Sequence, residues 1–284
     1  MISKLMIYLR LARLDKPVGI YLLLWPSLMG LMLGALNEGY IDFENYLIVL
    51  AGAILVRSCG CVINDISDYK FDKLVSRTKD RPIAKGEVSL KGAWIFFYIL
   101  AFSCLSLLMF VPKTTVEISL VIAVFILIYP LTKRFLKAPQ FFLGITFGSG
   151  TLISYSLASS NFSISIMILF LGAVLWIISF DTIYALEDED DDRIIGINST
   201  PILWEEKTII ISKILHLLFY ASLFLIFYLN QFSLLFLAIL FILLCIYFYQ
   251  YSLINEGKFL KAFKTNHWVG MLATIGFAAE IFLI

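Results

Sequence analysis

Charged residues, histidine and cysteine are scarce in this sequence, and each scarcity excludes a class of protein. Only 15% of the residues are charged and 61% are hydrophobic, with a mean hydropathy of +0.92, which excludes an ordinary soluble domain. The two histidines have no metal-ligand spacing, and the four cysteines all lie within apolar runs, so neither a thiolate metal site nor a disulfide is expected. The net charge of +1 gives no indication of nucleic-acid binding, and no such partner is expected.

A series of membrane-length apolar runs makes up most of the chain. We predict an all-α integral membrane protein with one transmembrane domain over residues 1–284 and about nine helical spans. The approximate bounds of the spans are 18–36, 46–63, 93–111, 115–130, 140–158, 163–180, 209–229, 232–250 and 267–284. The basic start followed by an apolar run also fits a signal peptide, but no small-residue cleavage site is evident, so a retained first span is expected.

The basic residues are distributed unevenly around these spans. Apart from Arg57 inside a span and Lys113 in an odd-numbered break, the 22 basic residues lie before the first span or in the breaks after even-numbered spans, with Lys213, near the start of the seventh span, counted in the break before it. Loops rich in Lys and Arg remain in the cytoplasm. The N-terminus and the even-numbered breaks are therefore predicted to be cytoplasmic, and the C-terminus to be outside.

Two acidic motifs follow even-numbered spans, the second and the sixth. The first motif is N-D-x-x-D-x-x-x-D over residues 64–72, and the second is D-x-x-Y-x-x-x-D-x-x-x-D over residues 181–192. Spacings of three and four residues place the carboxylates of each motif on one face of a helix. The candidate ligands are Asn64, Asp65, Asp68, Asp72, Asp181, Asp188 and Asp192.

Two carboxylate stripes at one membrane surface repel each other unless a cation lies between them. Because neither motif contains His or Cys, the cation favoured is a hard divalent ion such as Mg²⁺. Mg²⁺ prefers a few carboxylates together with phosphate oxygens, which points to a diphosphate substrate. The alternative for both motifs is a solvated acidic surface. The motifs start 116 residues apart, at Asp65 and Asp181, and both follow even-numbered spans, which suggests two related groups of four spans with the ninth span added at the end.

A diphosphate needs cationic partners from the protein as well. The candidates are Lys73, Arg77, Lys79 and Arg81 after the first motif, and Lys133 and Arg134 after the fourth span. Arginine suits bidentate phosphate recognition, and lysine supplies a point charge. Each of these residues could instead serve only to orient the protein in the membrane. The mixed charge around a turn at residues 77–82 predicts an ordered lid.

Arg57 is the one basic residue inside an apolar run. Eight residues of helix place it roughly 12 Å deeper in the membrane than Asp65. Intramembrane charge is costly and is usually functional. We predict that Arg57 contacts an anionic group of a substrate. The alternative is a salt bridge with an acid of another span, for which Glu117 and Glu280 are the candidates.

With these motifs the sequence resembles the UbiA superfamily of intramembrane prenyltransferases, and most closely its bacterial 4-hydroxybenzoate polyprenyltransferases. The resemblance covers most of the chain. The segments that carry it are LDKPVG at 14–19, LLLWP at 22–26, and residues 57–72, 77–82, 129–140 and 181–200. The segment SGTLISYSLA at 149–158 departs from the Trp- and Pro-containing stretch of that subgroup.

The resemblance implies nine transmembrane helices around a central cavity, in a bacterial inner membrane, with Mg²⁺ held by the two motifs. It implies transfer of a polyprenyl group from polyprenyl diphosphate to the carbon ortho to the hydroxyl of 4-hydroxybenzoate, in ubiquinone biosynthesis and in contact with membrane lipid. The residues implied as catalytic are Asp65, Asp68, Asp188, Asp192 and Arg57. Those implied as substrate contacts are Lys16, Arg57, Asn64, Arg77, Lys133, Arg134 and Tyr184.

Two alternatives to this function stay open. The first is a related prenyltransferase with another acceptor, such as haem, a naphthoate or a sugar phosphate. The second is a transporter, because many spans and an intramembrane charge also fit that class. Ion pathways need acids near the membrane midplane, whereas both motifs are predicted at one surface, and this disfavours the transporter.

Overall fold

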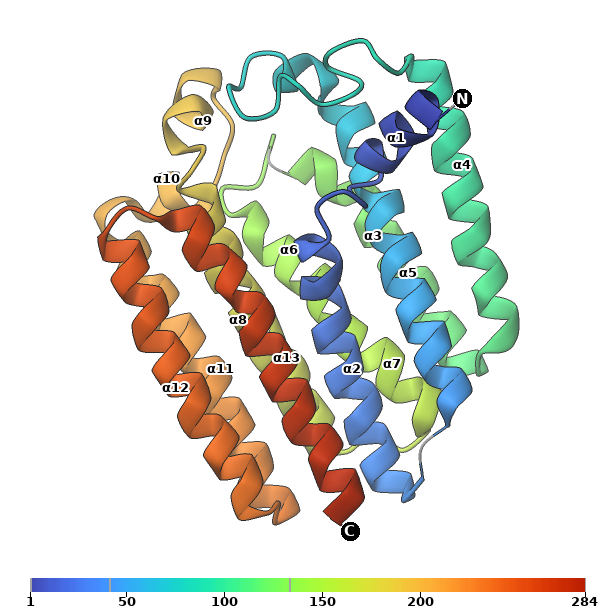
Figure 1. The fold of residues 1–284 in the computed structure, drawn as a ribbon, viewed down its shortest axis with the longest axis vertical. Helices are drawn as coiled ribbons and strands as arrows, with labels where there is room; N and C mark the ends of the chain where they lie inside the picture. The colour runs from blue at the N-terminus through green and yellow to red at the C-terminus, as the bar shows by residue number, and fades with distance from the viewer. Residues whose placement is uncertain (1, 41, 133, 284) are drawn as a thin grey trace.

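The computed structural model describes residues 2–40, 42–132 and 134–283, and Figure 1 shows a bundle of long helices with the chain termini at opposite ends. No β-strand occurs in these ranges, as predicted. The helices are α1 (Ile2–Leu11), α2 (Val18–Glu38), α3 (Phe43–Asp72), α4 (Leu90–Leu107), η1 (Leu108–Phe110), α5 (Lys113–Thr132), α6 (Pro139–Gly148), α7 (Gly150–Ala158), α8 (Ile164–Ala185), α9 (Glu189–Ile195), α10 (Thr200–Trp204), η2 (Glu205–Lys207), α11 (Thr208–Asn230), α12 (Leu234–Asn255) and α13 (Phe259–Leu283).

The ends of the long helices are set by polar and glycine caps. A helix in lipid must satisfy its own backbone groups, so its ends fall where side chains or turns can bond the terminal ones. The Asp42 carboxylate accepts a hydrogen bond from the backbone N–H of Glu44 at 2.9 Å and begins α3. Ser89 caps α4 in the same way. Gly39 ends α2 with a left-handed φ of 76°.

Eight helical stretches of the described chain are long and apolar enough to cross a membrane, which establishes a multi-pass membrane protein. The predicted count of nine is not confirmed, because α13, although 25 residues long, is less apolar than these eight stretches require. Its polar side chains bond inside the bundle: Asn266 accepts from Trp176 Nε1 at 2.8 Å, and Glu280 accepts from Ser233 Oγ at 2.6 Å. Helix α13 lies beside α2 and α12 (Figure 1).

The fifth predicted span, 140–158, is confirmed as one of the eight stretches, and Ser149 divides it into α6 and α7. Beside this break, the backbones of α2 and α7 are in contact. A Cβ added at Gly30 would lie 2.1 Å from the Thr151 carbonyl oxygen, and one added at Gly150 would lie 2.4 Å from Ser27 Oγ. Only glycine permits so close an approach.

The first acidic motif is helical throughout. The second span was predicted to end at residue 63, but α3 continues without a break to Asp72, so span and motif form one helix. Asp65, Asp68 and Asp72 are all buried, as expected for residues that share one face of a helix.

The second motif does not form the single helical stripe predicted over residues 181–192. Helix α8 ends at Ala185, a turn follows, and α9 begins at Glu189 with Asp188 at its N-cap. Four consecutive acids, from Glu189 to Asp192, occupy the first turn of α9. Negative side chains stabilise a helix N-terminus and destabilise a C-terminus, so the chain ends one helix before the acids and starts another with them.

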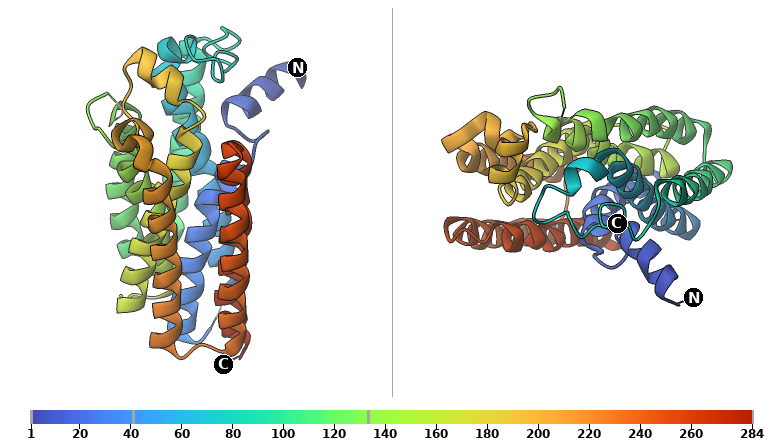
Figure 2. Two further views of the ribbon diagram at one scale, coloured as in Figure 1. Left: turned by 90° about the vertical axis from the view of Figure 1, so that its left-hand side faces the viewer. Right: turned by 90° about the horizontal axis from the view of Figure 1, so that it is seen from above.

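Both motifs nevertheless lie at one end of the bundle, the end that also carries α1 (Figure 1). One hydrophobic cluster runs through the bundle from Leu22 on α2 to Phe277 on α13. A second, smaller cluster joins α1, α3 and α4 around Val62 and Phe97. Figure 2 shows the long helices packed side by side, with α9 and the segment between α3 and α4 beyond their ends.

Candidate active site

Two arginines hold the first motif at the end of α3. Asp65 is 1% exposed and accepts hydrogen bonds from Arg13 Nη2, at 2.9 Å from each carboxylate oxygen, and from Arg81 Nη1 at 3.2 Å. The same Arg81 nitrogen lies 2.9 Å from both carboxylate oxygens of Asp72. Buried carboxylates need such charged donors. The two arginines and two aspartates therefore form one charge-balanced group.

Asp68, between these two aspartates on α3, is completely buried. Its Oδ1 lies 3.6 Å from Nη2 of Arg134, which also donates to the Ser67 carbonyl oxygen at 2.9 Å. The Arg134 guanidinium covers the ring of Phe71, 5.4 Å from its centroid. The structure thus brings the predicted Arg134 to the first motif. Lys133, predicted beside it, lies outside the described residues.

Arg77 connects the second motif to the segment that follows α3. Its Nε donates to Asp188 Oδ1 at 2.7 Å, and its Nη2 bonds the other carboxylate oxygen. Its Nη1 donates to the Tyr184 hydroxyl at 2.5 Å, and the guanidinium lies 4.8 Å from the centre of the Tyr184 ring. The backbone N–H of Ser76 donates to Asp191 at 3.2 Å. Both sequence-predicted residues, Arg77 and Tyr184, are therefore at the second motif.

Residues 73–88, which we call the arginine segment, contact both motifs. Arg77 reaches the second motif, whereas Arg81, one turn later, reaches the first. The Thr78 hydroxyl donates to the Asp72 carbonyl oxygen at 3.0 Å, and the side chain of Val75 is buried. The segment is thus bonded to both motifs, and its role as a lid over residues 77–82 stays a prediction.

Both arginines of the segment stay charged. Burial lowers the pKa of the Arg77 guanidinium, but its hydrogen bond with Asp188 and the negative charge there outweigh burial and raise the pKa overall. For Arg81, burial again lowers the pKa, and the charges of Asp65 and Asp72 raise it by more. The segment therefore presents two permanent positive charges to the two motifs.

Arg57 lies deeper, within the membrane-spanning part of α3. A Cβ added at Gly19 of α2 would lie 2.7 Å from Arg57 Nε, so a larger residue there would displace the guanidinium. The guanidinium carbon is 5.4 Å from the centre of the Phe147 ring of α6. The Nε atom is buried and has no hydrogen-bond partner among the described residues. The charge of Arg57 also interacts with that of Asp181 on α8.

Neither candidate for the alternative, a salt bridge between Arg57 and an acid of another span, pairs with Arg57 in this structure. Glu117 lies 3.6 Å from Lys113, on the exposed start of α5, and Glu280 bonds Ser233. Sequence spacing cannot show which helices are neighbours, and the acid that α8 brings toward Arg57 is Asp181 of the second motif.

Lys16 and Asn64 are not joined to the other predicted residues. Lys16 is exposed between α1 and α2, Asn64 is partly buried on α3, and neither side chain makes a polar contact with another described residue. Asp192 lies in the first turn of α9, where its carbonyl oxygen caps the helix end through the Gly196 N–H at 2.9 Å. Within the described ranges, no three acidic, His or Cys side chains converge as they would around a metal ion. Arginines lie among the carboxylates instead.

Arg13 is the residue at this site that sequence reasoning missed, because its charge was assigned only to membrane topology. It adopts a left-handed backbone with φ 59°, an uncommon conformation for a residue with a side chain. This turn after α1 directs the chain back over α3. The signal available in the sequence was its position directly before the LDKPVG segment.

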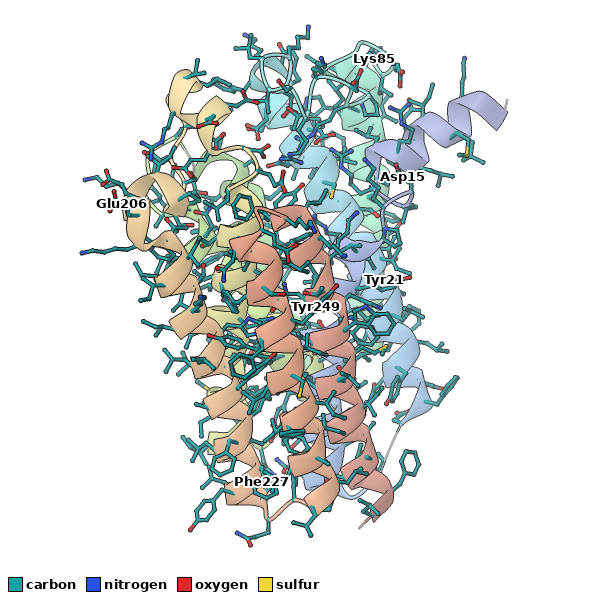
Figure 3. The ribbon with its side chains drawn as sticks, turned by 60° about the vertical axis from the view of Figure 1, so that its left-hand side comes forward. Asp15, Tyr21, Lys85, Glu206, Phe227 and Tyr249 are labelled. Carbon is teal, nitrogen blue, oxygen red and sulfur yellow. The ribbon has the colours of Figure 1, made fainter. Side chains whose placement is uncertain are left out.

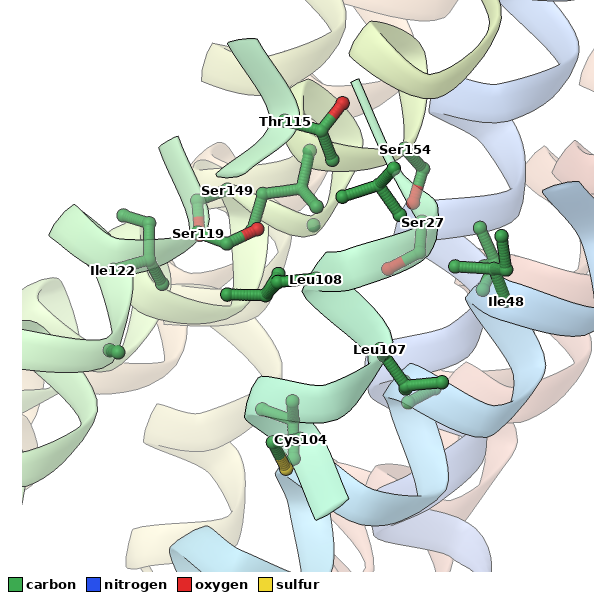
Figure 4. Close-up of a pocket in the computed structure, with 18 of the residues that line it drawn as sticks. Ser27, Ile48, Cys104, Leu107, Leu108, Thr115, Ser119, Ile122, Ser149 and Ser154 are labelled. Atoms are coloured by element: carbon green, nitrogen blue, oxygen red, sulfur yellow. The ribbon is translucent and has the colours of Figure 1, made fainter. Parts of the chain in front are cut away.

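An apolar cavity of about 180 Å³ lies between α2, α3, α4, α5 and α7 (Figure 4). Val56, next to Arg57 in sequence, lines it together with Ile126 and Leu157. The hydroxyls of Ser27 and Ser154 are among its few polar groups. The cavity therefore suits a hydrocarbon more than a polar molecule.

The sequence profile of the UbiA prenyltransferase family matches residues 23–277. The chain belongs to this family. A 4-hydroxybenzoate octaprenyltransferase from Vesicomyosocius okutanii is 37% identical over 274 residues, which cover 95% of this chain and 99% of that protein. The protein of the same name from Pseudomonas aeruginosa is 36% identical, and the match covers 96% of this chain and 93% of that protein.

Solved structures of family members have the same fold. A UbiA homologue from Aeropyrum pernix superposes with a TM-score of 0.79 at 23% identity, covering 90% of this chain and 97% of that one. A homologue from Archaeoglobus fulgidus, solved with GPP and Mg²⁺ bound, gives a TM-score of 0.73 at 17% identity, covering 97% and 99%. These likenesses establish the UbiA fold for this chain.

Proposed function

We propose that this member of the UbiA family transfers a polyprenyl group from polyprenyl diphosphate to 4-hydroxybenzoate, at the carbon ortho to the hydroxyl, in ubiquinone biosynthesis. The observation that carries the proposal is the arginine segment, because one short stretch of chain contacts both aspartate motifs, while a half-buried arginine and an apolar cavity lie deeper in the bundle. Relatives named for this reaction match nearly the full length of the chain.

The chemistry of the motifs fits Mg²⁺, since every side-chain donor is a hard oxygen. The residues that would hold it are Asp65, Asp68 and Asp72 from α3, with Asp181, Asp188 and Asp192 from the second motif and Asn64 beside the first. When bound, Mg²⁺ supplies positive charge that stabilises diphosphate as a leaving group. The arginines that hold these carboxylates are then available for phosphate oxygens.

The positive residues at the motifs bind and orient the diphosphate. Arg77 and Arg81 present planar guanidiniums from the arginine segment, and Arg13 and Arg134 present theirs from the other side of the first motif. Lys16 and Lys133 remain proposed phosphate contacts. The Tyr184 hydroxyl, already bonded to Arg77, holds that guanidinium in place.

Arg57 is the proposed anchor for the acceptor. Its buried Nε lacks a partner among the described residues, and an incoming carboxylate supplies one. With the carboxylate at Arg57, the phenol ring points from Arg57 toward the motifs, where the allylic carbon of the other substrate is held.

In the reaction the allylic C–O bond breaks and its electron pair leaves with the diphosphate. The ring carbon ortho to the hydroxyl forms the new C–C bond, and loss of its proton restores aromaticity. Water would capture the allylic cation, so the site must exclude it. The apolar cavity beside Val56 and the surrounding lipid provide that exclusion, and the isoprenoid tail stays in the membrane.

The distribution of basic residues further supports a placement with both motifs on the cytoplasmic side of a bacterial inner membrane. The aromatic substrate is then taken up from the cytoplasm, and the diphosphate product is released into it, on the side that the arginine segment faces.

Purified protein in lipid nanodiscs tests the reaction. It should convert labelled polyprenyl diphosphate and 4-hydroxybenzoate, with Mg²⁺, into a prenylated acid and diphosphate in equal amounts. Parallel reactions with haem, a dihydroxynaphthoate or a sugar phosphate measure acceptor choice. The proposal fails if 4-hydroxybenzoate gives no product while one of the others does, or if no acceptor is prenylated.

A further inference from the structure

The N-terminal helix α1 is apolar on the side that turns away from the protein. Its sequence, ISKLMIYLRL, has hydrophobic residues all around the helix, a pattern typical of a helix buried on every side. Yet Leu5 is 61% exposed and Met6 is 52% exposed. Adjacent exposed apolar side chains on a short helix indicate a surface that something covers.

The opposite side of α1 is firmly packed. The Tyr8 ring lies 5.1 Å from that of Phe96 on α4 in an edge-on contact, and Leu11 is completely buried against α3 and α4. Arg10 donates to Glu87 at 3.0 Å, which ties α1 to the arginine segment. The helix is therefore held in a defined orientation, and Leu5 and Met6 point outward because of it.

The position of α1 indicates what covers them. Seen from the motif end, α1 extends sideways beyond the outline of the bundle (right panel of Figure 2), over space that lipid fills around a membrane protein. The neighbouring turns of α4 carry Trp94 and Tyr98, which are stacked 5.8 Å apart and 39% and 63% exposed. Exposed Trp and Tyr near the end of a span mark the level of the membrane–water interface.

We propose that α1 is an interfacial helix that lies in the membrane surface, with Leu5 and Met6 buried among lipid acyl chains. Its exposed Lys4 sits at headgroup level, where a cation favours anionic phospholipid. The lipid surface thereby fixes α1, and with it the turn after α1 that presents Arg13 to Asp65. Neither the reaction nor the identity of the acceptor enters this inference, which rests on exposure, packing and position.

Depth-dependent fluorescence quenching tests the proposal. A variant lacking the four native cysteines receives a single cysteine in place of Leu5, is labelled with an environment-sensitive fluorophore, and is placed in nanodiscs of phosphatidylcholine and phosphatidylglycerol. Phe102→Cys on the lipid-facing side of α4, where Phe102 is 74% exposed, is the lipid control. Lys85→Cys is the water control, because Lys85 lies at the outer edge of the motif end, farther out than Asp15 (Figure 3).

The label at position 5 should emit at a shorter wavelength than the label at position 85. Brominated lipid should quench it, most strongly with bromines about 5–10 Å below the headgroups. Position 102 should instead be quenched best by deeper bromines. Emission and quenching equal to those at position 85 would place α1 in water and refute the proposal. A blue-shifted label that bromolipid cannot quench would show that protein covers this face, which refutes it equally.

Discussion

Removal of the positive charge at Arg57 should damage recognition of the acceptor more than recognition of the prenyl donor. Arg57 is half-buried in the membrane-spanning part of α3, and its buried Nε has no partner among the described residues. It is also roughly 12 Å of helix below Asp65. That depth leaves room for diphosphate and the reacting carbon at the motifs and for a benzoate carboxylate beneath them.

The size of the effect follows from leaving a charge buried without its partner. Truncating one member of a buried, hydrogen-bonded charge pair costs about 2–5 kcal/mol. At about 1.4 kcal/mol per factor of ten, Arg57→Leu should weaken 4-hydroxybenzoate recognition roughly 30-fold to a few thousand-fold. Arg57→Lys should recover only part of the loss, because an ammonium cannot form the bidentate contact of a guanidinium.

Asp181 makes a control essential, because its charge interacts with that of Arg57 and a loss at Asp181 could be mistaken for a loss at the acceptor. The control is an acceptor without the carboxylate, 4-hydroxybenzamide, assayed with the wild type and with Arg57→Leu. The variant should lose most of its kcat/KM with 4-hydroxybenzoate and little with the amide. The difference between the two losses isolates the Arg57–carboxylate interaction.

Equal losses with both acceptors would show that Arg57 serves the structure or Asp181 and not the carboxylate. An increase in KM for polyprenyl diphosphate alone would assign it to phosphate. Either result would refute the acceptor role.

Three further predictions concern the motifs and their placement. Asp68→Asn and Asp188→Asn should each abolish turnover while the circular dichroism spectrum stays helical. Chelation of Mg²⁺ should also abolish turnover by the wild type. Normal turnover by both variants with chelator present would refute the metal–diphosphate interpretation. Single cysteines at the exposed Leu74 and Ile194, 68% and 84% accessible, should resist a membrane-impermeant label added from the periplasm, and efficient labelling there would reverse the orientation. Glu187 accepts a 2.6 Å hydrogen bond from the Leu260 N–H, and this bond holds the turn before Asp188. Glu187→Ala should therefore reduce kcat/KM for the donor a few-fold, which corresponds to a loss of about 0.5–1.5 kcal/mol. Glu187→Gln should restore kcat/KM, and equal losses in both variants would contradict this role.

Helical spans and the helical first motif could be read from the sequence because their signals are local. Apolar runs give span length, and the offsets of Asp65, Asp68 and Asp72 give a shared face whatever surrounds it. The same reasoning failed for the second motif, where the spacing of Asp181 and Asp188 also fits a single helix. Helix α8 ends at Ala185 because of the charge of the four consecutive acids that follow, and residue spacing alone does not take this charge into account.

The partners of the charged residues could not be derived from the sequence at all. Arg13 reaches Asp65 through a left-handed turn, and Arg77 reaches Asp188 across more than a hundred residues of chain. Both contacts depend on which helices pack together, a long-range property. The depth of Arg57 could be predicted from the sequence, because it depends only on the rise of a helix. Its neighbours Gly19 and Phe147 could not be predicted.

The backbone contact between α2 and α7 determines which parts of the protein can move. At Gly30 the two helices meet without intervening side chains, so neither can slide along the other without first separating. Helix α2 also packs along α13, and these walls form a stiff frame. We therefore expect motion on substrate entry in the arginine segment and the turn before α9, and not between α2, α7 and α13. A frame of this kind cannot rock between two faces of a membrane as a transporter does, whereas it can keep a cation and its acceptor aligned.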